Sequence, residues 1–347
     1  MIDLSAKRTN IVSIAGIWRK ELHDYLFKMR TDKCKAMEGH TVISSHDTYF
    51  KKMKGVVDFK FSKAEINKAE KKWIKTELDY FKRNFNSIIL AGETAMIAEK
   101  NNYNARCVGA TDNAKGCYKD LMVGLYGSFT QQEDVNGVAR SHRFFRKLKI
   151  TTCPYCNRQY AVTLDCDNGK TAPEYDHFYY KSDYPVLAVS FYNLVPSCHT
   201  CNHIKGIKKT VTINPYFSGF ESRFVFVDDN DDSKLLTPAE VMKRGGGKIL
   251  LRRPDGTESA TDKGNIETFA LNEIYALHDQ YVSDIVVKVQ QYEGISKDLV
   301  STFQTKAKTP QEVYDFVWGR HLVDAEYEDR PLSKLTKELL EQLGVLP

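Results

Sequence analysis

The sequence predicts an α+β protein in which a small zinc-stabilised unit of two strands and a short helix is embedded between a mainly helical N-terminal region and a mixed α/β C-terminal region. Two Cys-x-x-Cys pairs near the middle of the chain predict the zinc-stabilised unit, and three- and four-residue apolar spacing before them predicts the helices. Because 347 residues exceed the usual size of one compact unit, we expect three segments, at 1–138, 139–217 and 218–347.

The composition is that of a globular protein, with 42% hydrophobic and 27% charged residues. The sequence contains no apolar run of membrane-spanning length and no secretory signal, so we expect a cytoplasmic protein without membrane contacts. Four of the eight cysteines form the two pairs, and the others stand singly, as reduced cysteines do, rather than in a disulfide framework.

In the N-terminal region the clearest predicted helix begins at Ser62, because Ser62 and Glu65 have the spacing of a capping box. The apolar residues that follow recur at three- and four-residue steps, which is the pattern of one buried helix face. They are Ile66, Ala69, Trp73, Ile74, Leu78 and Phe81. We expect Trp73 and Phe81 to pack in the core, since no chemically active residue is spaced with them.

Positive charge is concentrated in the middle of the chain. Between 140 and 215 there are eleven lysines and arginines against five aspartates and glutamates, although the net charge of the whole chain is only +5. Residues 138–150 predict a helix with its apolar residues inward, while Arg143 and Arg146 face outward and could contact a phosphate backbone. The alternative for this helix is an ordinary solvated face.

Each Cys-x-x-Cys pair can bind one side of a tetrahedral metal ion that prefers thiolate ligands. The four cysteines are Cys153, Cys156, Cys198 and Cys201. Together they would fill all four positions of a zinc ion and leave none for water, so we expect structural Zn²⁺. Because so small a unit has little apolar core, the ion would supply much of its stability.

The sequence predicts a β-hairpin between the two pairs and a short helix from the second pair onwards. The strands are expected at 159–164 and 171–175, joined by an Asp-Asn-Gly turn at 167–169. The helix is expected to run from Cys198 to Gly206, because glycine is a favourable C-terminal cap.

A second set of polar residues points to phosphodiester hydrolysis. Asp176 and His177 follow the second predicted strand, and Asn202 directly follows the last cysteine, where zinc would hold it opposite that strand end. Carboxylate and amide oxygens are hard ligands suited to Mg²⁺ or Mn²⁺, which would complete its shell with water and a phosphate. Beside such an ion, a neutral histidine can remove a proton from the attacking water. These are the parts of a one-metal phosphodiesterase.

This arrangement resembles the HNH endonucleases of the His-Me finger (ββα-metal) superfamily, in their four-cysteine, zinc-stabilised form. The resemblance covers about 153–206 and rests on both cysteine pairs, an Asp-His dipeptide and two asparagines in the expected order. It implies that His177 is the general base and that Asp176 and Asn202 hold the catalytic metal ion. It further implies that Asn193 braces the loop that carries the base.

The motif reads His-Asn-Asn here, because Asn202 stands where the family has histidine or asparagine. His203 is the alternative ligand, and otherwise it is a helix-surface histidine, while His199 is expected to pack near the zinc. We expect phosphate contacts from Lys205, three residues after Asn202, and from Lys181, in the loop after the base.

The resemblance implies metal-dependent cleavage of DNA that leaves 5′-phosphate and 3′-hydroxyl ends. Two alternatives stay open: the same nuclease acting on RNA or tRNA, or a non-catalytic, zinc-dependent nucleic-acid-binding module. The helical N-terminal region, an Asp-His-Phe-x-x-Lys-Ser loop and a later Asn-Pro-Tyr are more loosely similar to the nuclease partner of the ATPase in Septu-type anti-phage systems. This likeness implies a DNA-degrading defence effector with an ATPase partner.

The C-terminal region is expected to contain a strand at 224–227 followed by an acidic loop. The basic, glycine-rich run at 243–248 is expected to be a flexible hairpin tip whose side chains could contact nucleic acid. A long helix is expected at 265–292. A last amphipathic helix, with its leucines between 332 and 343, could dock on this region or on a partner protein.

Overall fold

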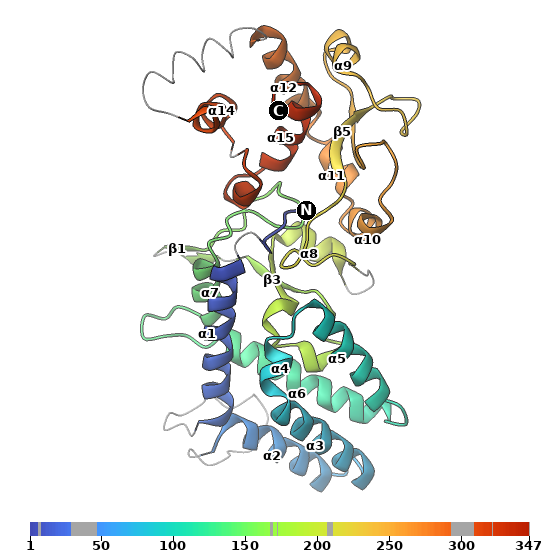
Figure 1. The fold of residues 1–347 in the computed structure, drawn as a ribbon. Helices are drawn as coiled ribbons and strands as arrows, with labels where there is room; N and C mark the ends of the chain where they lie inside the picture. Colours follow the sequence, from blue (N-terminus) through green and yellow to red (C-terminus); the bar gives the residue numbers. More distant parts are fainter. Residues whose placement is uncertain are drawn as a thin grey trace. The chain divides into compact units, whose positions relative to one another are not determined.

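The computed structural model describes most of the chain, namely residues 1–5, 8–28, 47–166, 169–171, 173–206, 211–292, 309–320 and 322–346 (Figure 1). The chain forms two compact units. We call the first the helical unit, made of 9–148 and 176–195, and the second the cysteine unit, made of 1–8, 149–175 and 196–347.

The helical unit contains the predicted helices of the N-terminal region. They are α1 (Arg8–Phe27), α2 (Tyr49–Ser62), α3 (Lys68–Arg83), α4 (Phe85–Ile89), α5 (Glu93–Arg106), α6 (Asp112–Thr130) and α7 (Arg140–Leu148). Trp18 on α1 is a centre of its core, with edge-on ring contacts to Phe129 at 4.9 Å and to Phe144 at 4.8 Å between centroids. None of the described helices is long and apolar enough to cross a membrane.

The start predicted for α3 at Ser62 is wrong. Ser62 is the last residue of α2, and its hydroxyl donates a hydrogen bond back to the Phe59 carbonyl at 2.7 Å. The capping box is formed five residues later, where Asn67 and Glu70 exchange side-chain hydrogen bonds with each other's backbone. Most of the predicted apolar face is buried, including Phe81, but Ala69 is exposed. Trp73 is half-buried, and its indole N–H donates to the Arg106 carbonyl at 3.0 Å.

Strands occur in three small two-stranded sheets among the described residues, so the fold is α+β as expected. The sheets pair β1 (Leu164–Cys166) with β2 (Gly169–Thr171), β3 (Glu174–His177) with β4 (Leu194–Ser197), and β5 (Arg223–Val227) with β6 (Lys248–Arg252). The 3₁₀ helices η2 (Pro185–Leu187) and η3 (Phe191–Asn193) lie between β3 and β4 in the sequence.

The predicted hairpin is antiparallel, but its strands are shifted and divided. The first strand begins only at Leu164, near the end of the predicted range, and the residues before it form no regular strand. The second predicted strand is split between β2, which pairs with β1, and β3, which pairs with β4. Pro173 lies at the division, and proline has no N–H to continue a ladder. The predicted turn residues 167 and 168 lie outside the described residues.

The remaining helices belong to the cysteine unit. They are α8 (His199–Lys205), α9 (Pro238–Arg244), α10 (Ala260–Thr268), α11 (Leu271–Ala276), α12 (Asp279–Tyr292), α14 (Pro310–Trp318) and α15 (Ser333–Gln342), with the 3₁₀ helix η4 (Asp324–Asp329) before the last. The single helix predicted at 265–292 is therefore wrong. Ala270 has a left-handed backbone (φ 48°) that ends α10, and Leu277 at the end of α11 is 74% exposed.

The glycine-rich run at 243–248 is not a hairpin tip. It caps α9, because Gly245 adopts the left-handed conformation (φ 72°) that commonly ends a helix. The acidic loop after β5 pairs with the basic residues on either side: Arg244 lies 3.0 Å from Asp228, and Lys248 lies 2.6 Å from Asp232. Two of the basic residues that could have contacted nucleic acid, Arg244 and Lys248, are thus ion-paired within the unit.

The C-terminal helix α15 docks on the cysteine unit itself. Its leucines Leu335 and Leu339 are fully buried. Its polar side chains complete the edge of β5, where Glu338 accepts a hydrogen bond from the Phe224 N–H and Gln342 accepts one from the Phe226 N–H, both at 2.8 Å. The sequence left open whether this helix docks on the C-terminal region or on a partner protein. In the structure it docks on the C-terminal region.

Candidate functional site

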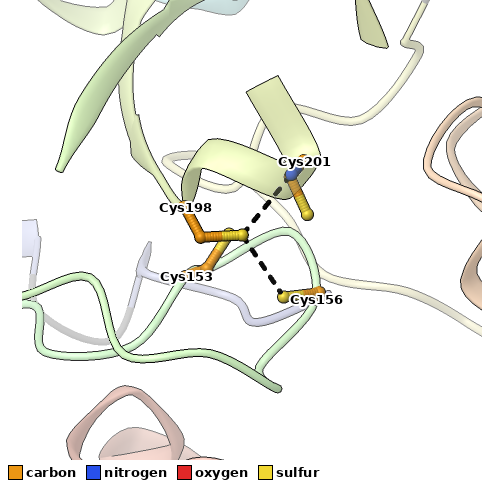
Figure 2. A group of neighbouring side chains, drawn as sticks. All are labelled: Cys153, Cys156, Cys198 and Cys201. Carbon is orange, nitrogen blue, oxygen red and sulfur yellow. Dashed lines mark hydrogen bonds between the residues drawn. The ribbon is translucent and has the colours of Figure 1, made fainter. Parts of the chain in front are cut away.

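The four paired cysteines form a compact cluster in the cysteine unit (Figure 2). Their sulfur atoms all lie within 4.8 Å of one another, and those of Cys156 and Cys198 are 4.0 Å apart. A tetrahedral ion with zinc–sulfur bonds of about 2.3 Å places its ligands about 3.8 Å apart, so a small contraction of the cluster would suffice. All four residues are buried, at 5% exposure or less.

Local backbone structure orients these sulfurs. Cys198 is the N-cap of α8, and its sulfur accepts a hydrogen bond from the Cys201 N–H at 3.4 Å. The first pair surrounds a tight turn in which Asn157 has a left-handed backbone (φ 47°) and donates its N–H to the Cys153 carbonyl at 2.7 Å. The Arg158 N–H points at the Cys156 sulfur at 3.4 Å. Such N–H···S contacts stabilise thiolates, which are the form that binds metal.

Asn157 also joins the first cysteine pair to the C-terminal part of the unit, a role that the sequence did not indicate. Its amide donates to the Tyr327 carbonyl at 2.7 Å and accepts from the Lys334 N–H at 3.0 Å. Nearby, the ring of Tyr155 stacks on Phe269 with 4.3 Å between centroids. The first pair is therefore built into a packed core rather than carried on a separate finger.

The electrostatics of the cluster favour a bound cation. Contacts with the other three sulfurs lower the pKa of the Cys156 thiol, whereas burial raises the pKa of the Cys153 thiol. Four buried thiolates would repel one another without a positive ion between them. Within the described residues this is the group of His, Cys, Asp and Glu side chains whose ligand atoms lie close enough to share a metal ion, and it is compatible with zinc binding.

Asn202 lies on α8 one residue after the last cysteine, and Glu174 on β3 holds its side chain. The Asn202 amide nitrogen donates a short hydrogen bond to one Glu174 oxygen, and the other oxygen lies 2.8 Å from Nδ1 of His199. Burial disfavours the charged carboxylate, but these hydrogen bonds outweigh it and keep the pKa of Glu174 below its ordinary value. Because a carboxylate only accepts, the amide oxygen of Asn202 faces away from Glu174.

His203 is exposed, and its ring stacks on the ring of His199 with 5.8 Å between centroids. His199, which directly follows Cys198, is also exposed, and its Nδ1 lies 2.8 Å from a Glu174 oxygen. Lys205, expected to meet a phosphate, is buried at 2% exposure.

In the helical unit, Asp176 and His177 end β3 and are both buried. Nε2 of His177 lies 3.0 Å from the Ala188 carbonyl oxygen, and its ring meets Tyr126 edge-on at 4.6 Å between centroids. Since a carbonyl can only accept, Nε2 carries a proton, so Nδ1 is the nitrogen that is basic whenever the ring is neutral.

Asn193 is fully buried and bonds to the loop that follows His177. Its side-chain oxygen accepts from the Tyr179 N–H at 2.7 Å, and its amide nitrogen donates to the carbonyls of Tyr179 and Leu187, each at 3.0 Å. Three side-chain hydrogen bonds to backbone groups fix both ends of this loop. The loop is further held by Trp18, whose indole N–H donates to the Val189 carbonyl at 3.0 Å.

The other basic residues expected to contact phosphate differ in how free their charged groups are to bind an anion. The Lys181 ammonium lies over the ring of Tyr126, 5.0 Å from its centroid, and burial lowers its pKa. Arg143 is near two carboxylates, at 3.6 Å from Glu21 and 3.9 Å from Asp134. Arg146 is exposed on α7, as predicted.

The four predicted zinc ligands lie within one unit, whereas the predicted catalytic set is divided between the two units. Asp176, His177, Asn193 and Lys181 belong to the helical unit, and the four cysteines with Asn202 belong to the cysteine unit. Comparison of the chain with protein-family models, curated proteins and solved structures finds no match. The function of the protein is therefore inferred from these candidate site residues alone.

Proposed function

We propose that the protein is a metal-dependent HNH endonuclease that hydrolyses phosphodiester bonds in DNA. In this proposal His177 is the general base, Asp176 and Asn202 hold one Mg²⁺ or Mn²⁺ ion, and the four cysteines hold a structural Zn²⁺ ion. The looser sequence resemblance supports a role as an effector of anti-phage defence that works with an ATPase partner.

The hydrogen bond between His177 and the Ala188 carbonyl carries the proposal. It selects the tautomer in which Nδ1 is unprotonated, which is the state a general base needs before it takes a proton from water. Burial of the ring against Tyr126 fixes its orientation, so that little reorganisation is needed on reaction.

Asn193 supports the same reading, because its three hydrogen bonds hold the loop that begins one residue after His177 and includes Ala188. The base and the carbonyl that orients it are therefore fixed by one buried amide. This is the bracing role that the resemblance implies for the middle asparagine.

The order of the secondary-structure elements along the chain also supports the proposed nuclease. Strand β3, the braced loop, strand β4 and helix α8 follow one another, which is the ββα order of the family. The cysteines fix the start of α8, and Glu174 turns the Asn202 amide so that its oxygen, a suitable metal ligand, faces away from the carboxylate. A divalent ion bound by Asp176 and Asn202 would stabilise negative charge on the phosphate and on the leaving oxygen.

The test is a cleavage assay with plasmid, linear and single-stranded DNA and with total RNA, each with Mg²⁺ or with a chelator. We expect DNA cleavage that requires the added ion. Cleavage of RNA alone would select the alternative substrate, and tight binding without cleavage would select the non-catalytic zinc module. No cleavage of any substrate, alone or with an ATPase encoded beside it, would contradict the nuclease.

Replacing Asn202 with alanine should leave zinc in place and weaken the use of Mg²⁺. We expect the Mg²⁺ concentration for half-maximal cleavage to rise by about tenfold or more, since one ligand of the ion is lost. Zinc content and an Mg²⁺ titration of the cleavage rate measure both effects. The matched control is His203→Ala on the next residue of α8. If His203→Ala rather than Asn202→Ala changes the Mg²⁺ requirement, the assigned ligand is wrong.

A further inference from the structure

The cysteine unit has a shallow cavity of about 560 Å³ that the proposed nuclease does not use. It is lined by Arg158, Gln159, Tyr160, Arg320 and Pro331. Three of these residues directly follow the first cysteine pair, and the other two flank η4. Among the residues that the structure describes, the lining thus contains two arginines and a tyrosine but no carboxylate.

The guanidinium groups of the two arginines are incompletely hydrogen-bonded. The Nε atoms of Arg158 and Arg320 are buried and have no hydrogen-bond partner among the described residues. The Nε atom of Arg252 in the same unit also lacks a partner, but that arginine is ion-paired with Glu258 through Nη1 at 2.6 Å. Buried donors without acceptors are costly in free energy, and an anion bound between the guanidinium groups would satisfy them.

The side chain of Arg320 and the backbone of Arg158 are both held by further contacts. Arg320 donates through Nη1 to the Gly319 carbonyl at 2.9 Å, and its guanidinium lies 5.4 Å from the centre of the Tyr281 ring. The backbone N–H of Arg158 contacts the Cys156 sulfur, and the Gln159 carbonyl accepts from the Cys153 N–H at 2.9 Å. The cavity wall is therefore part of the metal-binding turn, which restricts its motion.

Tyr160 adds an aromatic surface beside these charges. It is 61% exposed, although its backbone is fixed by a β-bridge to Thr152. Exposed aromatic rings next to arginines are typical of sites that stack a base and bind its phosphate. We propose that this cavity binds a phosphorylated nucleoside, with the phosphate on Arg158 and Arg320 and the base on Tyr160.

Two sources share this chemistry, a nucleotide within a nucleic-acid strand and a free nucleotide. The proposal uses none of the residues assigned to cleavage, so the two can fail separately. In the first case the cavity would be a contact surface for a nucleic-acid strand beside the proposed zinc site. In the second case it would be a binding site for a small molecule.

Binding of a fluorescently labelled single-stranded oligonucleotide, measured by anisotropy without added divalent metal, tests the proposal. Arg320→Ala should weaken binding about tenfold or more and reduce the slope of log affinity against log salt by about 0.7, the loss of one phosphate contact. Tyr160→Ala should weaken binding about fivefold or more through lost stacking. Competition by AMP and ADP separates the two sources: displacement of the probe indicates a nucleotide site, and its absence indicates a strand.

Arg253→Ala is the matched control, because it removes the same charge from an ion-paired arginine of the same unit. It should leave affinity within about twofold of the wild type. Zinc content and the unfolding temperature of each variant show whether the fold is kept. Equal affinity of Arg320→Ala and wild type, or an equal loss in Arg253→Ala, would overturn the proposal.

Discussion

Replacement of Cys198 with serine is expected to release the bound zinc and unfold the surroundings of α8. Serine is a good N-cap, so it can still accept the hydrogen bond from the Cys201 N–H that the cysteine sulfur accepts now. The substitution therefore removes the thiolate ligand while sparing the helix cap. Structural zinc in small domains contributes on the order of 10 kcal/mol, so we expect a large drop in the unfolding temperature.

Zinc per chain, measured by mass spectrometry of the metal, and thermal unfolding give the result directly. The control is Cys117→Ser, which changes a buried cysteine of the helical unit outside the cluster. It should keep one zinc ion per chain. Retention of zinc by the Cys198→Ser protein would mean that the four assigned ligands are not the right ones.

The second large effect is expected from His177→Ala. Loss of a general base typically lowers a rate by about 10²–10⁴-fold, and we expect DNA cleavage in Mg²⁺ to fall by that amount. The residue is 6% exposed and packs on Tyr126, so some stability is also lost. Initial rates of plasmid nicking, normalised to zinc-loaded folded protein, separate the two consequences.

His23→Ala serves as the matched control, since His23 is a partly exposed histidine of α1 in the same unit. Its cleavage rate should equal that of the wild type. If His177→Ala cleaves every substrate as fast as this control, His177 is not the base and the proposed chemistry fails.

The cysteine cluster and helix α8 were predictable from the sequence because their determinants are local. Two residues separate the members of each pair, and Gly206, with φ 51°, ends the helix where a C-terminal cap was expected. Packing between distant segments decided the features that the sequence did not reveal. Glu174 reaches Asn202 across 28 positions, and Asn157 bonds to residues 170 or more positions away.

Competing local signals explain the other differences. Ser62 and Glu65 match a capping box, but Asn67 and Glu70 match it too, and only the end of α2 decides between them. The acidic loop and the basic glycine-rich run looked like independent surfaces in the sequence. In the fold they are joined through the pairing of β5 with β6, so their charges are paired.

The central claim is that two metal ions have separate roles, one structural and one catalytic. Zinc content and DNA cleavage, measured on the same sample before and after brief EDTA treatment and again after Mg²⁺ is restored, test it most directly. Because the cysteines are buried, we expect zinc to stay near one ion per chain while cleavage disappears and then returns with Mg²⁺. Cleavage that survives EDTA, or that is lost with zinc and restored only by zinc, would contradict the account.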